Sequence, residues 1–204
     1  IVLPLVAHNR QRLDSIELFA FKKMISSGSG GMMVAHLNVP ALDPDKNLPS
    51  SLSPLIVDSL LKKEMRFKGI VFTDAMTMGG ITEHHKSIAA NIMAIKAGND
   101  ILVMPEEIPK TISAIQKEIR RGNISQEDID SRCKKILAAK YWIGLKDYKP
   151  VVLNDLLTDL NKPEFRLQNQ RLVEASITLL ENKNDLIPLK RLDTLKVASI
   201  TIGG

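Results

Sequence analysis

The chain has 204 residues, of which 44% are hydrophobic and 25% charged, an ordinary composition for a globular protein. Its 28 basic and 23 acidic residues leave a net charge of +5. The basic residues are scattered and only 4% of residues are aromatic, which disfavours a nucleic-acid-binding surface. The single cysteine, Cys133, excludes disulfides and Cys-rich metal sites, and no apolar run reaches the roughly 18 residues that span a bilayer.

The first part of the chain predicts a helix followed by a strand. The helix is expected over residues 13–27, capped by Asp14, with Leu13 and Leu18 as a hydrophobic staple. The strand is expected over residues 32–36, after a glycine-rich break.

The same rhythm continues to about residue 145. A proline-punctuated loop leads to Ser53-Pro54, which is a typical helix start. The further elements expected are a helix after Pro54, a strand over 70–73 that stops at Asp74, a helix over 84–97, a strand over 101–104, a helix over 108–122, and a helix capped by Ser125 that ends near residue 142.

Three strands separated by crossover helices predict an α/β fold with a parallel sheet and right-handed connections. Such a sheet is covered by helices on both faces or closes into a barrel, and three strands cannot close a barrel of eight. The chain begins and ends abruptly, so we interpret it as an internal piece of a longer protein.

The last sixty residues have a different character. Residues 146–165 are predicted to connect two domains, since they contain Lys149-Pro150 and Lys162-Pro163. A helix near 164–175, an apolar run at 177–180 and a strand at 196–202 would then begin a second α/β domain over residues 166–204.

Asp74 is the strongest candidate for chemistry. It follows the buried run Ile70-Val71-Phe72-Thr73, and the carboxyl ends of parallel strands face the active site in both barrels and open α/β sheets. His36 ends the preceding strand in the same way, so the two side chains are expected at one edge of the sheet. The alternatives are a turn aspartate and a hydrogen-bonded structural histidine.

The other candidates are weaker. Met76 and Met78 could line a sugar face or simply pack. His84 and His85 are adjacent, so they do not share a helix face and are better explained as solvated capping residues than as metal ligands. His8 is expected in a loop. No dinucleotide, phosphate-loop, HExxH or CxxC motif is present.

The segment Val71-Phe72-Thr73-Asp74-Ala75-Met76-Thr77-Met78-Gly79-Gly80 resembles glycoside hydrolase family 3, most of all its bacterial β-N-acetylglucosaminidase (β-N-acetylhexosaminidase) branch. Three flanking segments agree: Met33-Val34-Ala35-His36-Leu37-Asn38-Val39-Pro40-Ala41-Leu42-Asp43, Pro49-Ser50-Ser51-Leu52-Ser53 and Lys96-Ala97-Gly98-Asn99-Asp100-Ile101-Leu102-Val103-Met104-Pro105. The resemblance covers most of residues 1–145. Residues 172–189 resemble the opening of the family's second, α/β sandwich domain.

The resemblance implies that residues 1–145 are the C-terminal part of a (β/α)8 TIM barrel, about its last three βα units. It also implies that Asp74 is the nucleophile of a retaining mechanism, with His36, Met76 and Met78 as substrate-binding candidates. The acid/base of this branch lies on a mobile loop, which would come just upstream of Ile1, so none is assigned here. Residues 1–204 expressed alone are therefore expected to be inactive.

The function implied is removal of terminal β-linked N-acetylglucosamine from glycans, including peptidoglycan fragments, with no metal or other cofactor. A β-glucosidase of the same family is the alternative, and a non-catalytic glycan-binding barrel protein is a third. The sequence leaves the compartment open, although the resemblance favours a periplasmic or cell-surface location over a cytoplasmic one.

Overall fold

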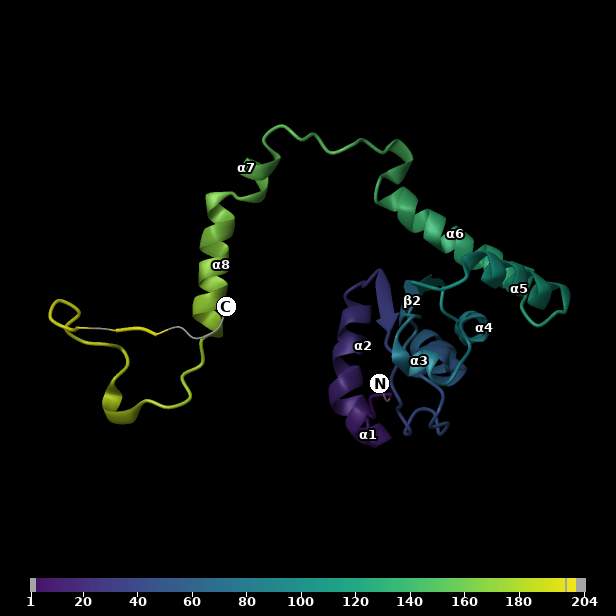
Figure 1. Ribbon diagram of the computed structural model, residues 1–204, viewed down its shortest axis with the longest axis horizontal. Coiled ribbons are helices and arrows are strands. Elements are labelled where there is room, and N and C mark those ends of the chain that lie inside the picture. Colours follow the sequence, from purple (N-terminus) through teal and green to yellow (C-terminus); the bar gives the residue numbers. More distant parts are fainter. Residues whose placement is uncertain (1–2, 197, 201–204) are drawn as a thin grey trace. The chain divides into compact units, whose positions relative to one another are not determined.

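The computed structural model describes residues 3–196 and 198–200 (Figure 1). The chain divides into two compact units, residues 1–148 and residues 149–204. The division falls inside the connector predicted at 146–165.

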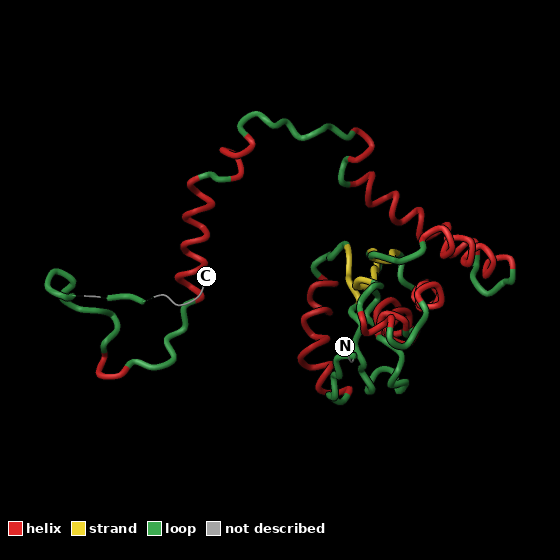
Figure 2. The backbone as a smooth tube through the Cα atoms, viewed as in Figure 1, coloured by secondary structure: helices red, strands yellow, loops and turns green. Residues whose placement is uncertain are grey.

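A three-stranded parallel sheet forms the centre of the first unit, in the order β1-β2-β3 (Figure 2, yellow). Its strands are β1 (Gly31–Val34), β2 (Ile70–Ala75) and β3 (Ile101–Val103). Met33 pairs with Phe72 and Val34 with Thr73, while Phe72 pairs with Ile101 and Ala75 with Val103. The prediction of three parallel strands joined by helices is therefore confirmed.

Helices connect and flank these strands. They are α1 (Arg10–Arg12), η1 (Leu13–Glu17), α2 (Leu18–Ser26), η2 (Ser50–Leu52), η3 (Leu55–Glu64), α3 (Gly79–Thr82), α4 (Ser87–Ala97), α5 (Ile108–Arg120), α6 (Gln126–Trp142) and η4 (Leu145–Asp147).

The start of the first helix was predicted wrongly. The cap is Asn9, whose side chain accepts a hydrogen bond from the Arg12 backbone N–H at 2.8 Å. Asp14 lies inside the helical run, where its carboxylate accepts from Arg10 Nε at 2.7 Å and Lys22 Nζ at 3.0 Å. Asn is as good a cap as Asp, so the residue type alone did not distinguish the two positions.

Two later helix starts were also predicted. At the first, helix α4 begins at Ser87 rather than near 84, and His84 and His85 fall in the turn after α3. At the second, the Ser125 side chain caps α6 by accepting from the Asp128 N–H, as predicted.

Helices cover one face of the sheet. Val34 and Val71 pack there against Val57 and Leu61 of η3. Because successive side chains of a strand point to opposite faces, Phe72 belongs to the other face, as does Met33, which is 51% exposed. The register of β2 against β3 then shifts between Phe72 and Ala75. Asp74 lies within this irregular stretch, at the carboxyl end of the central strand, and is partly buried.

The second unit contains α7 (Leu156–Leu160), α8 (Pro163–Ser176) and η5 (Lys183–Asp185). None of its described residues is buried. The predicted helix near 164–175 is present, but the apolar run 177–180 is not paired in a sheet. The strand predicted at 196–202 lies partly outside the described residues, and its described part, 196 and 198–200, is unpaired. A sandwich domain here stays a prediction.

Candidate active site

A cavity of about 430 Å³ opens at the carboxyl end of the sheet. The residues that line it come from the ends of β1 and β2 and from the segments that follow them, with one contribution from the start of the chain: Pro4, Ala35, His36, Leu37, Asp74, Thr77, Met78, Gly79 and Gly80. The structure thus brings together His36 and Asp74, the two residues that the strand pattern placed at one edge.

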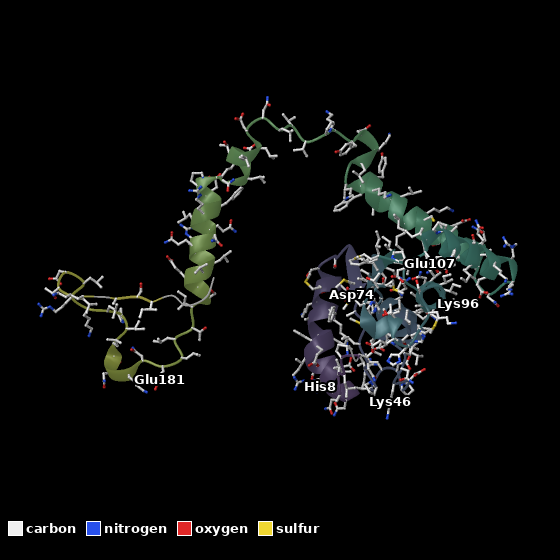
Figure 3. The ribbon with its side chains drawn as sticks, viewed as in Figure 1. His8, Lys46, Asp74, Lys96, Glu107 and Glu181 are labelled. Carbon is white, nitrogen blue, oxygen red and sulfur yellow. The ribbon has the colours of Figure 1, made fainter. Side chains whose placement is uncertain are left out.

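Asp74 lies at the carboxyl end of β2 and lines this cavity. Its side chain is partly buried, and its Oδ1 atom accepts a hydrogen bond from the Ala75 backbone N–H at 2.8 Å. The cavity gives a ligand access to the carboxylate, and the strand restricts how the carboxylate can move. Figure 3 labels Asp74 among the side chains of the first unit. A carboxylate held in this way can act as a nucleophile or as a base.

His36 is only 4% exposed and both of its ring nitrogens are engaged. Nε2 lies 3.0 Å from the Ala75 carbonyl oxygen, and Nδ1 lies 2.6 Å from Ser51 Oγ. A carbonyl can only accept, so we assign the proton to Nε2 and let the Ser51 hydroxyl donate to Nδ1.

Burial lowers the pKa of His36, although the Ala75 carbonyl and the charge of Asp74 act in the opposite direction. The neutral imidazole in the assigned tautomer agrees with that direction. Both ring nitrogens of His36 already bond to the protein. The predicted contact between His36 and a substrate is therefore limited to the carbon atoms of the ring.

Ser51 is a site residue that the sequence analysis missed. It is fully buried in η2, and its backbone carbonyl accepts a hydrogen bond from Asn99 Nδ2 at 2.8 Å. The neighbouring Ser50 hydroxyl donates to the Ala35 carbonyl at 2.6 Å. Two adjacent serines after Pro49 in an otherwise proline-punctuated loop were the available signal, because small hydroxyl side chains can bond to nearby backbone.

The two methionines have different places. Met78 is 46% exposed and lines the cavity, so a contact with substrate stays open to it. Met76 is 3% exposed and packs with Leu52, Ile81 and Ala90 in the core. The expectation that Met76 lines the sugar site is corrected: it faces the core, and it is absent from the cavity wall.

The remaining histidines lie elsewhere. Figure 3 shows His8 well apart from Asp74, and its Nε2 atom lies 4.0 Å from Glu17 Oε1. His85 Nε2 lies 3.2 Å from the Asn47 carbonyl oxygen, and neither His84 nor His85 lines the cavity. Within residues 3–196 and 198–200, no group of three or more His, Cys, Asp or Glu side chains could hold a metal ion.

Comparison with known proteins decides the family. Residues 2–139 match the profile of the Glycosyl hydrolase family 3 N terminal domain. The chain belongs to glycosyl hydrolase family 3. The N-terminal domain of this family is a TIM-barrel-like α/β fold, which agrees with the parallel sheet and flanking helices of the first unit.

One solved structure and one relative of the family each match about nine-tenths of the chain. A family 3 β-N-acetylglucosaminidase from Paenibacillus sp. is 33% identical, with a TM-score of 0.80 over 89% of this chain and 35% of its own. Beta-hexosaminidase A of Pseudoalteromonas piscicida is 28% identical over 92% of this chain and 34% of its own length.

A third relative, from Cellulomonas fimi, is named as a beta-N-acetylglucosaminidase/beta-glucosidase. It is 26% identical over 84% of this chain and 32% of its own length. The family 3 chain described here therefore spans about a third of the length of these relatives. In the part of it that the structure describes, no helix is long and apolar enough to cross a membrane.

Proposed function

We propose that the protein containing this chain is a retaining glycosidase that removes terminal β-linked N-acetylglucosamine, with Asp74 as the nucleophile. The observation that carries the proposal is the position of Asp74, on a paired strand and facing a cavity of about 430 Å³. The names of the Paenibacillus and Pseudoalteromonas relatives support the substrate class. Peptidoglycan fragments are substrates of suitable chemistry.

The proposed reaction begins with attack of an Asp74 oxygen on the anomeric carbon, which forms a glycosyl ester as the leaving group departs. The transition state resembles an oxocarbenium ion, so the negative carboxylate also stabilises its charge. Water then cleaves the ester, and two inversions give net retention. The second group, which protonates the leaving oxygen and later deprotonates water, is not assigned to any residue of this chain.

Met78 is proposed to pack against a face of the sugar. It is the most exposed large apolar side chain of the cavity wall, and it lies four residues after Asp74. Apolar side chains with a few well-placed polar groups are typical of small-molecule sites.

A β-glucosidase is the second candidate, because the Cellulomonas relative carries both activities in its name. The test compares kcat/KM for aryl β-N-acetylglucosaminide and aryl β-glucoside, using the protein as its gene encodes it. Preference for the N-acetylated substrate supports the first candidate, and preference for the glucoside supports the second.

Retention is tested on the same protein by NMR of the first sugar released. The β anomer is expected from a β-linked substrate. An initial α anomer would show that Asp74 acts as a base on water and would overturn the nucleophile assignment. Absence of turnover on both aryl substrates, with folding shown by a cooperative melt, would instead favour a non-catalytic glycan-binding protein.

A further inference from the structure

We infer that His36 is a positioning residue for Asp74: its side chain takes the place of a missing backbone partner of β2 and fixes the peptide that follows the nucleophile. The inference rests on the proposed function, because it supposes that Asp74 reacts. It gives His36 a role other than direct substrate binding.

The pairing between β1 and β2 ends just before it would reach the nucleophile. The last paired residues are Val34 and Thr73, one position short of Asp74. Pairing with β3 continues further, since Ala75 pairs with Val103 and the Met76 N–H donates to the Val103 carbonyl at 2.9 Å. On the β1 side, the backbone of β2 therefore needs another partner at Ala75.

His36 provides that partner. Its Nε2–H donates to the Ala75 carbonyl at 3.0 Å, on the side from which β1 would have donated. The peptide between Ala75 and Met76 is thus held from both neighbours, by His36 through its C=O and by β3 through its N–H. The N–H of Ala75 donates to Asp74 Oδ1, so the carboxylate is oriented by the same residue whose carbonyl His36 fixes.

The imidazole is itself anchored from behind. Ser51 Oγ lies 2.6 Å from Nδ1, and the Ser51 carbonyl accepts from Asn99 Nδ2, which also donates to the Ala94 carbonyl at 2.8 Å. His36, Ser51 and Asn99 are all buried. Side chains locked by packing and hydrogen bonds are those that can hold a reacting group within the small tolerance that catalysis needs.

Two amide substitutions at His36 test the roles of its two ring nitrogens separately. A Gln side chain places its amide near the position of Nε2 and can still donate to Ala75. An Asn side chain places its amide near the position of Nδ1 and reaches only Ser51. The experiment measures kcat, KM and melting temperature for His36→Gln, His36→Asn and His36→Ala in the protein as its gene encodes it, with aryl β-N-acetylglucosaminide as substrate.

Misplacement of a reacting group by about 1 Å can cost on the order of 100-fold, so His36→Asn and His36→Ala are expected to lower kcat about 10- to 100-fold. Their KM should stay within about twofold of wild type, since a loss confined to the transition state leaves KM unchanged. His36→Gln should recover kcat to within about fivefold of wild type, because it keeps the donor that orients the site.

The matched control is the same pair of substitutions at His85. This histidine also has Nε2 near a backbone carbonyl, that of Asn47 at 3.2 Å, but it does not line the cavity. Equal kcat values for His36→Gln and His36→Asn would overturn the inference, as would a loss that appears in KM alone.

Ser51→Ala provides a second route if the His36 variants fail to fold. Removing the Ser51 hydroxyl removes the hydrogen bond that holds His36 in the Nε2–H tautomer. This change is expected to lower kcat about two- to fivefold with KM unchanged. An unchanged kcat would count against the inference. The Asp74→Asn variant distinguishes the two proposals. If Asp74→Asn retains activity, the proposed function is wrong. If Asp74→Asn is inactive but His36→Gln and His36→Asn have equal kcat values, only the proposed role of His36 is wrong.

Discussion

An aspartate lies at each end of the parallel sheet, and the two differ in burial and in hydrogen-bond partners. At the carboxyl end, Asp74 is partly buried, faces a cavity and is oriented by the Ala75 N–H. At the amino end, the Asp100 side chain is fully buried. It accepts from the Val71 N–H at 2.8 Å and from Lys135 Nζ at 2.9 Å, with Lys62 Nζ at 3.5 Å.

The surroundings of Asp100 add further ties. Lys62 also donates to the Gly98 carbonyl, and Lys135 lies 3.3 Å from the Gly69 carbonyl oxygen. Asp100 thus links η3, α6 and the starts of two strands. The Asp100 carboxylate therefore stabilises the fold, whereas the Asp74 carboxylate remains accessible to a ligand. We expect substitutions at the two ends to separate activity from stability.

The largest effect is expected at the carboxyl end. Asp74→Asn is nearly isosteric and removes the proposed nucleophile, so kcat should fall on the order of 10⁴-fold or more. The melting temperature should be close to that of wild type, because the amide can still accept from the Ala75 N–H. Activity within tenfold of wild type at matched stability would contradict the assigned role of Asp74.

The opposite pattern is expected for Asp100→Asn. Removing one member of a buried ion cluster leaves Lys62 and Lys135 without their partner, which should cost about 3 kcal/mol of unfolding free energy in denaturant titrations. The folded fraction should keep its kcat. Asp58→Asn is the control, since the Asp58 pair with Lys63 is solvent-exposed and should contribute only about 0–1 kcal/mol.

Gly98 tests the same end of the sheet through its backbone. This glycine ends α4 with φ of 116°, and a Cβ added there would meet Val57 Cγ1 at 3.3 Å. Gly98→Ala should destabilise the protein by about 1–2 kcal/mol, measured by chemical denaturation. Gly122→Ala shares the positive φ, 75°, but has no atom within 4 Å of the added Cβ. The loss at Gly122 should be smaller, because the added Cβ meets no atom there and φ of 75° lies closer to the left-handed helical region than 116° does.

The elements that could be predicted from sequence are those with strong local signals. Three apolar runs predicted the three strands, and the residue at the end of the second run, Asp74, proved to face the cavity. The Ser125 cap was found because its polar side chain directly precedes a long helical pattern.

The elements that could not be predicted depend on contacts between distant residues. The bond from Ser51 to His36 joins positions 15 apart, and the bond from His36 to Ala75 joins positions 39 apart. Met76 and Met78 have the same side chain two positions apart in one loop, and only the packing of Met76 against Ile81 and Ala90 distinguishes them. Such pairings follow from the tertiary arrangement, which a local pattern does not encode.

The smallest effect expected concerns pH and returns to the carboxyl end. Burial holds the pKa of His36 in the folded protein below its usual value of 6.5. At a pH between these two pKa values, His36 binds a proton in the unfolded chain but not in the folded protein. The unfolding free energy contributed by this group should therefore fall as pH decreases from about 6.5 and level off below the folded pKa. The groups that face it are the Ser51 hydroxyl, the Ala75 carbonyl and the Asp74 carboxylate.

The measurement compares the unfolding free energies of wild type and His36→Gln between pH 7.5 and pH 4.5. Hydrogen bonds to charged partners lower the pKa values of carboxylates such as Asp14 and Glu118. Their contribution to the unfolding free energy is lost in acid in both proteins, so it cancels when the two are compared. The advantage of wild type over His36→Gln should shrink on acidification. A difference that grows instead would mean that His36 is charged in the folded protein, and the assigned Nε2–H tautomer, with Ser51 donating to Nδ1, would then be wrong.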